Sequence, residues 1–206
     1  MRYTGPKNRI ARRENMDLGL KTTGSKSQAL LLKKINIFPG QHGTKGRRKK
    51  SEHSRQLREK QKLRYTFGVT EKQLKNYFSK ASRKRGNTSI FLVELIEQRL
   101  DNVVYRLGFA PTRAAARQIV SHGHITVNEK KVTIPSYHIE VGDNITFRKE
   151  ESKKIPYIET FRAQTDLIIP EWLQVKKDIG SLLKIPDTSL LEKMINLRLV
   201  IEFYSK

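Results

Sequence analysis

The spacing of apolar residues changes once along this chain of 206 residues, and that change limits the fold to a mixed class. From Ser51 to Gly123, apolar side chains recur at intervals of three and four residues, which is typical of amphipathic helices. Beyond Gly123 the period falls to about two, in residues 125–127 and 145–147, with turns at Asn128-Glu129 and at 141–144. We therefore predict an α+β fold in which helices precede a small antiparallel sheet.

Glycines and capping residues mark where the predicted helices begin and end. Gly68 follows a stretch free of glycine and proline, where a left-handed C-terminal cap fits. Thr70 and Gln73 have the spacing of a capping box, and Thr112 is a good N-cap. The predicted helices cover residues 51–67, 71–85, 87–107 with a break around Arg99, and 113–122, the last forming a helix-turn-helix with the segment before it.

The two ends of the chain carry weaker signals. Residues 1–50 show no sustained period and contain many turn-forming glycines, so we predict an extended, loop-rich arm that a partner orders. After Glu150 the apolar pieces are short, and residues 197–203 resemble a strand. Four parts are therefore expected: a basic arm (1–50), a helical domain (51–90) joined by part of the C-terminal tail, a module of a helix-turn-helix and a small sheet (91–150) and a C-terminal extension (151–206).

Positive charge is concentrated in the first part of the chain. Residues 1–90 contain 25 basic and 5 acidic residues, a net charge of +20, whereas residues 91–206 contain 17 and 15, a net charge of +2. This asymmetry favours a polyanion-binding surface attached to a nearly neutral body. An acidic membrane is the alternative partner, but the basic stretch 45–50 is very polar and contains a glycine. We also see no signal peptide and no apolar run long enough to span a bilayer.

The chemistry of the side chains argues against a metal or cofactor. The sequence contains no cysteine, which excludes disulfides, thiolate zinc sites, iron–sulfur clusters and cysteine nucleophiles. His122 and His124 flank Gly123, but no further ligands have the spacing of a closed metal site. We therefore expect no metal and no cofactor, and favour contacts of these histidines with RNA or the domain surface.

Two groups of side chains allow both a binding and a structural interpretation. Arg113 and Arg117 share one helix face close to helix N-termini, where phosphate is attracted, although a solvated face is the simpler alternative. Four aromatic residues could stack on bases, but their helical spacing favours packing in a core. These are Tyr65, Phe67, Tyr77 and Phe78.

Several blocks resemble known sequences. Arg99-Leu100-Asp101, Thr112-Arg113, residues 120–128 and Gly142-Asp143 resemble the small RNA-binding module named after a small-subunit ribosomal protein. The likeness then extends over essentially the whole chain, which resembles the bacterial-type family of small-subunit ribosomal protein four. The blocks that carry it are residues 1–13, 39–43, 57–78, 97–128, 134–137 and 202–206.

This resemblance implies a function. It implies a structural constituent of the small ribosomal subunit that binds the 5′ domain of 16S rRNA first and nucleates assembly of the 30S body. It also implies contact with ribosomal protein five, an influence on translational accuracy and a place near the mRNA entry channel. Localisation would be cytoplasmic, in a bacterial or organellar ribosome, with neither a membrane nor DNA as partner.

The sequence departs from the family pattern at two places. Many relatives carry an N-terminal cysteine cluster that binds zinc, whereas residues 6–13 contain no thiol, so a zinc-free variant is expected. The hairpin turn that is often Asn-Gly in the family is Asn128-Glu129, which lacks the glycine that adopts a positive φ easily.

RNA recognition is expected to depend mainly on shape and phosphates, because side chains cannot read the major groove of A-form RNA. The basic runs should dominate affinity, and the arginines of helix 113–122 should fix orientation. The candidate RNA-binding residues are Arg2, Lys7, Arg9, Arg12, Arg13, Lys45, Arg47, Arg48, Lys49, Lys50, Arg55, Arg58, Lys62, Arg64, Arg83, Lys84, Arg85, Thr112, Arg113, Arg117, Ser121 and His122.

An RNA-modifying enzyme is the rival interpretation. Pseudouridine synthases carry the same module and a catalytic aspartate in an Arg-Leu-Asp motif, which Arg99-Leu100-Asp101 matches superficially. Here the triplet opens the binding module, and the 56 residues after Glu150 are too few for a typical catalytic domain. We therefore predict that the protein is not an enzyme and that Asp101 is an ion-pair or helix residue.

Overall fold

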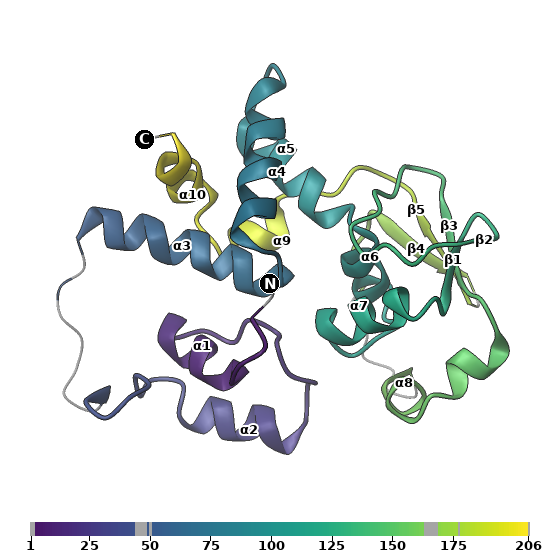
Figure 1. The fold of residues 1–206 in the computed structure, drawn as a ribbon, viewed down its shortest axis with the longest axis horizontal. Coiled ribbons are helices and arrows are strands. Elements are labelled where there is room, and N and C mark those ends of the chain that lie inside the picture. The colour runs from purple at the N-terminus through teal and green to yellow at the C-terminus, as the bar shows by residue number, and fades with distance from the viewer. Residues whose placement is uncertain (1–2, 44–48, 50, 163–168, 177, 206) are drawn as a thin grey trace. The chain divides into compact units, whose positions relative to one another are not determined.

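A computed structural model describes residues 3–43, 49, 51–162, 169–176 and 178–205 (Figure 1). Its contacts divide the chain into two compact units. The helical unit comprises residues 1–92 and 189–206, and the sheet unit comprises residues 93–188. The chain therefore leaves the helical unit, forms the sheet unit and returns. Helices and an antiparallel sheet confirm the predicted α+β class.

The helical unit is built around two long helices whose ends follow the predicted signals. Ser51 caps α3 by accepting a hydrogen bond from the Ser54 amide, and Gly68 ends it with a φ of 61°. Thr70 and Gln73 form the predicted capping box at the start of α4. The helices described in this part of the chain are α1 (Lys7–Glu14), α2 (Lys26–Lys33), α3 (Glu52–Phe67), α4 (Glu71–Arg83), α9 (Ser189–Glu192), α10 (Leu197–Tyr204) and α5 (Thr88–Glu97), which contains the boundary between units.

The structure differs from the extended arm predicted for residues 1–50. These residues include α1 and α2, and they bury Ile10, Ala11, Leu18 and Leu31. Each helix has eight residues, which is too short to produce a sustained period in the sequence. The loop after α2 is tied to α1, because the Arg12 guanidinium donates to the carbonyls of residues 37 and 38.

The strand predicted for residues 197–203 is wrong, because this segment forms α10. Asn196 caps the helix by accepting a hydrogen bond from the Leu199 amide. Leu197 and Val200 are buried, and α10 lies against α3 (Figure 1). A short, nearly continuous apolar run fits both a strand and a helix, so packing decides between them.

The sheet unit combines several helices with five antiparallel strands in the order β2-β1-β3-β5-β4. The last two strands come from residues beyond Glu150, where the sequence signal is weak, and they extend the sheet past β3. The elements are α6 (Leu100–Arg106), α7 (Arg113–Ser121), β1 (Ile125–Val127), β2 (Lys130–Lys131), β3 (Asn144–Phe147), the 3-10 helix η2 (Glu150–Lys154), α8 (Pro156–Arg162), β4 (Leu173–Lys176) and β5 (Ile179–Leu182).

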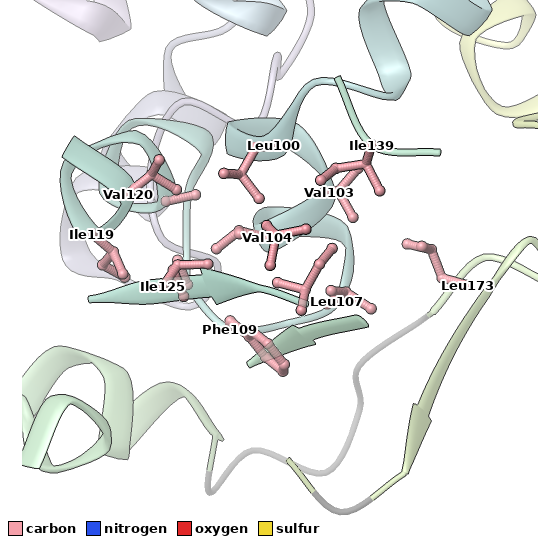
Figure 2. Packing of buried hydrophobic residues seen from close by; sticks show 14 of the residues in the cluster. Leu100, Val103, Val104, Leu107, Phe109, Ile119, Val120, Ile125, Ile139 and Leu173 are labelled. Atoms are coloured by element: carbon pink, nitrogen blue, oxygen red, sulfur yellow. The ribbon is translucent and has the colours of Figure 1, made fainter. Parts of the chain in front are cut away.

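One hydrophobic core joins α6 and α7 to the sheet. Figure 2 shows side chains of α6, α7 and β1 converging, among them Val104, Ile119 and Ile125, all of which are buried. Gly180 in β5 faces the Leu107 side chain at the end of α6, and a Cβ atom at this position would clash with it unless that side chain moved. Glycine therefore suits this close approach of β5 to the end of α6.

The β1–β2 hairpin turns through two residues in the left-handed region. Asn128 has a φ of 48° and Glu129 has a φ of 65°. The Asn128 side chain holds the next turn, because its Nδ2 donates to Asp143 Oδ1 at 2.7 Å and its Oδ1 accepts from the Asn144 amide at 2.9 Å. In the part of the chain described here, no helix is both long and apolar enough to cross a membrane.

Candidate nucleic-acid interface

Helix α7 begins as predicted at Thr112, whose Oγ1 accepts a hydrogen bond from the Ala115 amide at 3.2 Å. Thr112 itself is buried. At the other end, Ser121 Oγ donates to the carbonyl of Arg117 at 2.8 Å, and His122 follows as an exposed C-cap residue. These contacts fix both ends of the helix that carries Arg113 and Arg117.

The two arginines of α7 are anchored by residues of α6. Arg113 Nε donates to Asn102 Oδ1 at 2.8 Å, and Arg117 Nη1 donates to Asp101 Oδ2 at 3.0 Å. The Arg117 side chain remains 29% exposed. The face of α7 that carries Arg113 and Arg117 is therefore not simply solvated, because each guanidinium group is hydrogen-bonded to a buried residue of α6.

Asp101 is a buried ion-pair residue, as predicted. Its two carboxylate oxygens accept hydrogen bonds from Nε and Nη2 of Arg99 at 3.0 and 2.7 Å, in addition to the bond from Arg117. Arg99 is 1% exposed and Asp101 is 4% exposed. A catalytic aspartate needs an accessible carboxylate, so this arrangement does not favour the enzyme interpretation.

A second buried carboxylate completes the network behind α7. Glu97 pairs with Arg106 at 2.6 Å, and its backbone carbonyl accepts a hydrogen bond from Asn102 Nδ2 at 2.9 Å. Burial alone would lower the pKa of Arg106, but the charge and hydrogen bonds of Glu97 outweigh it and raise the pKa. For Arg113, burial and the nearby Arg106 charge lower the pKa to about 10. Both guanidinium groups therefore stay positive at neutral pH.

The candidate residues of the helical unit divide by exposure and by partner. Four half-buried side chains also hold the fold together: Arg12 binds backbone carbonyls, Arg58 pairs with Glu14 at 2.9 Å, Lys62 pairs with Glu59 at 2.6 Å, and Arg64 lies 3.5 Å from Glu71. Lys7 and Arg13 are half-buried as well. The exposed candidates are Arg9, Lys49, Arg55, Arg83, Lys84 and Arg85. Arg2, Lys45, Arg47, Arg48 and Lys50 lie outside the described residues.

The aromatic residues of α3 and α4 contact other parts of the protein. Phe67 is buried, as the core interpretation predicts, while Tyr65, Tyr77 and Phe78 are half-buried. The Phe78 ring stacks on Tyr204 with centroids 5.0 Å apart, and Tyr65 meets Tyr3 edge-on at 5.8 Å.

Sequence reasoning missed a cluster of polar residues in the sheet unit. Arg148 and Lys149 follow β3, and the fold brings them beside His122 and His124 around a cavity of about 260 Å³. No short-range pattern marks them, because the strand pairing β1–β3 creates the neighbourhood. Within the described ranges, no three histidine, aspartate or glutamate side chains gather where they could hold a metal ion.

Two family models match the chain in succession. Residues 2–97 match the model described as ribosomal protein S4/S9 N-terminal domain, and residues 98–145 match the S4 domain. Curated relatives called small ribosomal subunit protein uS4 align over 100% of this chain and 99% of their own length. They come from Aquifex aeolicus (48% identical), Geotalea daltonii (44%) and Neisseria meningitidis (45%).

Proposed function

Because the chain belongs to the uS4 family of small ribosomal subunit proteins, which have a structural, rRNA-binding role, we propose that it binds 16S rRNA in the 5′ domain. In this proposal it binds early and nucleates assembly of the 30S body. The anchored α7 carries the argument: a helix fixed at both ends presents Arg117 from a buried ion pair, so the direction of the cation is set before RNA arrives.

In this proposal, each part of the chain has its own role in binding rRNA. Residues 1–50 and 51–90 supply most of the attraction to phosphate, because they carry nearly all of the net charge. Residues 91–150 orient the complex through Arg113 and Arg117. Residues 151–206 complete the sheet with β4 and β5 and the helical unit with α9 and α10.

The proposal includes the protein neighbours that the family resemblance implies. We place ribosomal protein five beside this protein, where the contact influences translational accuracy, and mRNA near its entry channel. The similarity over the full length of bacterial uS4 proteins supports this assignment. It also supports a location in the ribosome and a structural, non-enzymatic role.

A single substitution tests the α7 surface. Arg117→Gln keeps an amide that can donate to Asp101 but removes the charge, so folding should change little. Binding of a 5′-domain 16S rRNA fragment at fixed salt should weaken by about tenfold or more, because a charge-assisted hydrogen bond contributes roughly 1.5–3 kcal/mol. The matched control is Arg198→Gln, which changes an 87% exposed arginine of α10.

Each outcome of these measurements is informative. If Arg117→Gln binds rRNA more weakly than Arg198→Gln and the parent, the result supports the α7 interface. If both variants bind with the affinity of the parent, α7 is not part of the RNA interface. Stoichiometric sedimentation with small subunits tests the function itself, since an RNA-modifying enzyme would be substoichiometric and would leave a modified nucleotide. A parent protein that binds no 16S rRNA would contradict the proposed function.

A further inference from the structure

The cavity in the sheet unit lies where three segments of chain meet. It has a volume of about 260 Å³ and is formed by the turn between α7 and β1, the end of β3, and η2. Its lining residues include one carboxylate, one buried hydroxyl group and several nitrogen-bearing side chains. They are His122, Gly123, His124, Arg148, Lys149, Glu151, Ser152 and Ile155.

Backbone geometry brings these side chains together. Gly123 has a φ of 74°, so the chain reverses between His122 and His124, whose ring centroids lie 6.2 Å apart. The Arg148 amide donates to the His124 carbonyl at 2.8 Å, which continues the β1–β3 pairing beyond the strands. The Ser152 amide donates to the Lys149 carbonyl at 3.0 Å and closes the first turn of η2.

The polar groups of the cavity suit an oxyanion. His124 Nδ1 lies 3.0 Å from Ser152 Oγ, and Ser152 is 5% exposed. When the serine hydroxyl donates to Nδ1, the proton of the neutral ring sits on Nε2, which becomes a donor for a ligand. Arg148 and Lys149 add two positive charges against the single carboxylate of Glu151. Such a group of donors and cations favours a phosphate over a neutral or cationic ligand.

We propose that this cavity binds a phosphate group of the RNA backbone. The inference rests on the proposed function, and it adds His124, Arg148 and Lys149 to the interface. His122, which lines the cavity, follows α7 directly as its C-cap residue, so the cavity lies at the C-terminal end of the helix that carries Arg117. Arg148 and Lys149 are both exposed and accessible to an RNA strand.

A matched pair of lysine substitutions in the full-length chain tests the site. Lys149→Ala and Lys154→Ala remove the same charge from exposed positions five residues apart, but only Lys149 lines the cavity. At fixed salt, Lys149→Ala should weaken binding of a 5′-domain 16S rRNA fragment by about tenfold relative to Lys154→Ala. Phosphate-modification interference should also disappear at one position of the RNA in Lys149→Ala and persist in Lys154→Ala.

Thermal melts separate a binding effect from a folding effect. If the melting temperature of Lys149→Ala is lower than that of Lys154→Ala, the binding measurements are repeated with Arg148→Gln in place of Lys149→Ala. Arg148→Gln should then show the same decrease in rRNA affinity and the same loss of phosphate-modification interference. Equal affinities of cavity and control variants, with the parent still binding RNA, would overturn the phosphate site and leave the proposed function intact. Failure of the parent to bind would instead remove the proposed function.

A titration with inorganic phosphate distinguishes the source of the anion. Phosphate should shift the ring signals of His122 and His124 in NMR spectra of the parent, and the rRNA fragment should compete with it. If phosphate shifts these signals while Lys149→Ala and Lys154→Ala bind RNA equally, the cavity is a site for free anions and the RNA proposal is wrong.

Discussion

At the scale of single residues, Asp101 connects three parts of the sheet unit. Its carboxylate binds Arg99 in front of α6 and Arg117 on α7, while only 4% of the residue is exposed. Removing one partner of a buried pair is costly because the other charge remains in a poorly solvated site.

We expect Asp101→Ala to lower the free energy of unfolding by about 3–5 kcal/mol, because Arg99 would stay buried without its carboxylate. Urea denaturation of the full chain measures this decrease. Arg198→Ala is the control, since it breaks an exposed pair worth about 0–1 kcal/mol. A decrease below about 1 kcal/mol in Asp101→Ala would show that the buried pair is not required.

Glu129 offers the opposite experiment, a substitution that stabilises. Its φ of 65° is unfavourable for a side chain with a Cβ atom. Glu129→Gly should raise the free energy of unfolding by about 0.5–1 kcal/mol, after subtracting the entropy that glycine adds to the unfolded chain. Thermal denaturation should show the increase, whereas Lys130→Gly in the adjacent strand β2 should destabilise. A lower melting temperature for Glu129→Gly would contradict this account.

At the scale of elements, α10 is fastened to α3 and α4 by a polar cluster. Glu71 Oε1 accepts hydrogen bonds from Lys60 Nζ and from the Tyr204 hydroxyl, each at 2.8 Å. Burial raises the pKa of Glu71, but these hydrogen bonds and the charges of Lys60 and Arg64 outweigh it, so the pKa is lowered. The pKa of Tyr204 is raised, first by burial and then by Glu71.

These shifts predict how stability depends on pH. A lowered carboxyl pKa stabilises the fold at pH values above about 4.3, and the contribution is lost as the pH falls through the native pKa. A raised tyrosine pKa stabilises below about pH 10 and is lost at higher pH. Glu71→Gln should therefore be less stable than the parent at pH 7 and should converge with it in acid.

Denaturation at a series of pH values measures the difference between the two proteins. Glu192→Gln, at an exposed position of α9, removes the same charge away from the cluster and serves as control. A constant difference between Glu71→Gln and the parent at every pH would show that this carboxylate does not couple to folding.

Local capping signals predicted three of the helices. The sequence placed α3, α4 and α7 within a few residues, because Gly68, Thr70 and Thr112 act on neighbouring backbone groups. It missed α1, α2, β4 and β5, which have four or eight residues each, and it assigned α10 to the wrong class. Runs of four or eight residues are too short to establish a period, so packing and pairing decide their structure rather than the local sequence pattern.

The residues of the candidate site could be predicted only in part. The arginines of α7 could be named from their spacing, but their anchoring by Asn102 and Asp101 requires the packing of α6 on α7. Lys149 joins the site only through the strand pairing that places it beside His124.

At the scale of the whole molecule, the uneven charge predicts an uneven response to salt. Each phosphate-binding cation that is removed should reduce the slope of log affinity against log salt by about 0.9 for duplex nucleic acid. We expect Arg9→Gln, Arg55→Gln and Arg83→Gln together to flatten the slope for rRNA. The same number of changes in the sheet unit, Lys130→Gln, Lys154→Gln and Lys184→Gln, should have little effect; all six positions are exposed. Equal flattening by both sets would contradict the concentration of phosphate-binding cations in residues 1–90.

The interrupted course of the chain also affects how the protein matures. α10 packs against α3, and the Asn196 amide donates to Glu59 at 2.9 Å, so residues 1–92 depend on partners from residues 189–206. During synthesis from the N-terminus, the sheet unit emerges as one continuous segment and can close at once. The helical unit is made first and completed last. The surfaces that α10 covers on α3 and α4 stay uncovered until the sheet unit has been made, so the helical unit closes after the sheet unit.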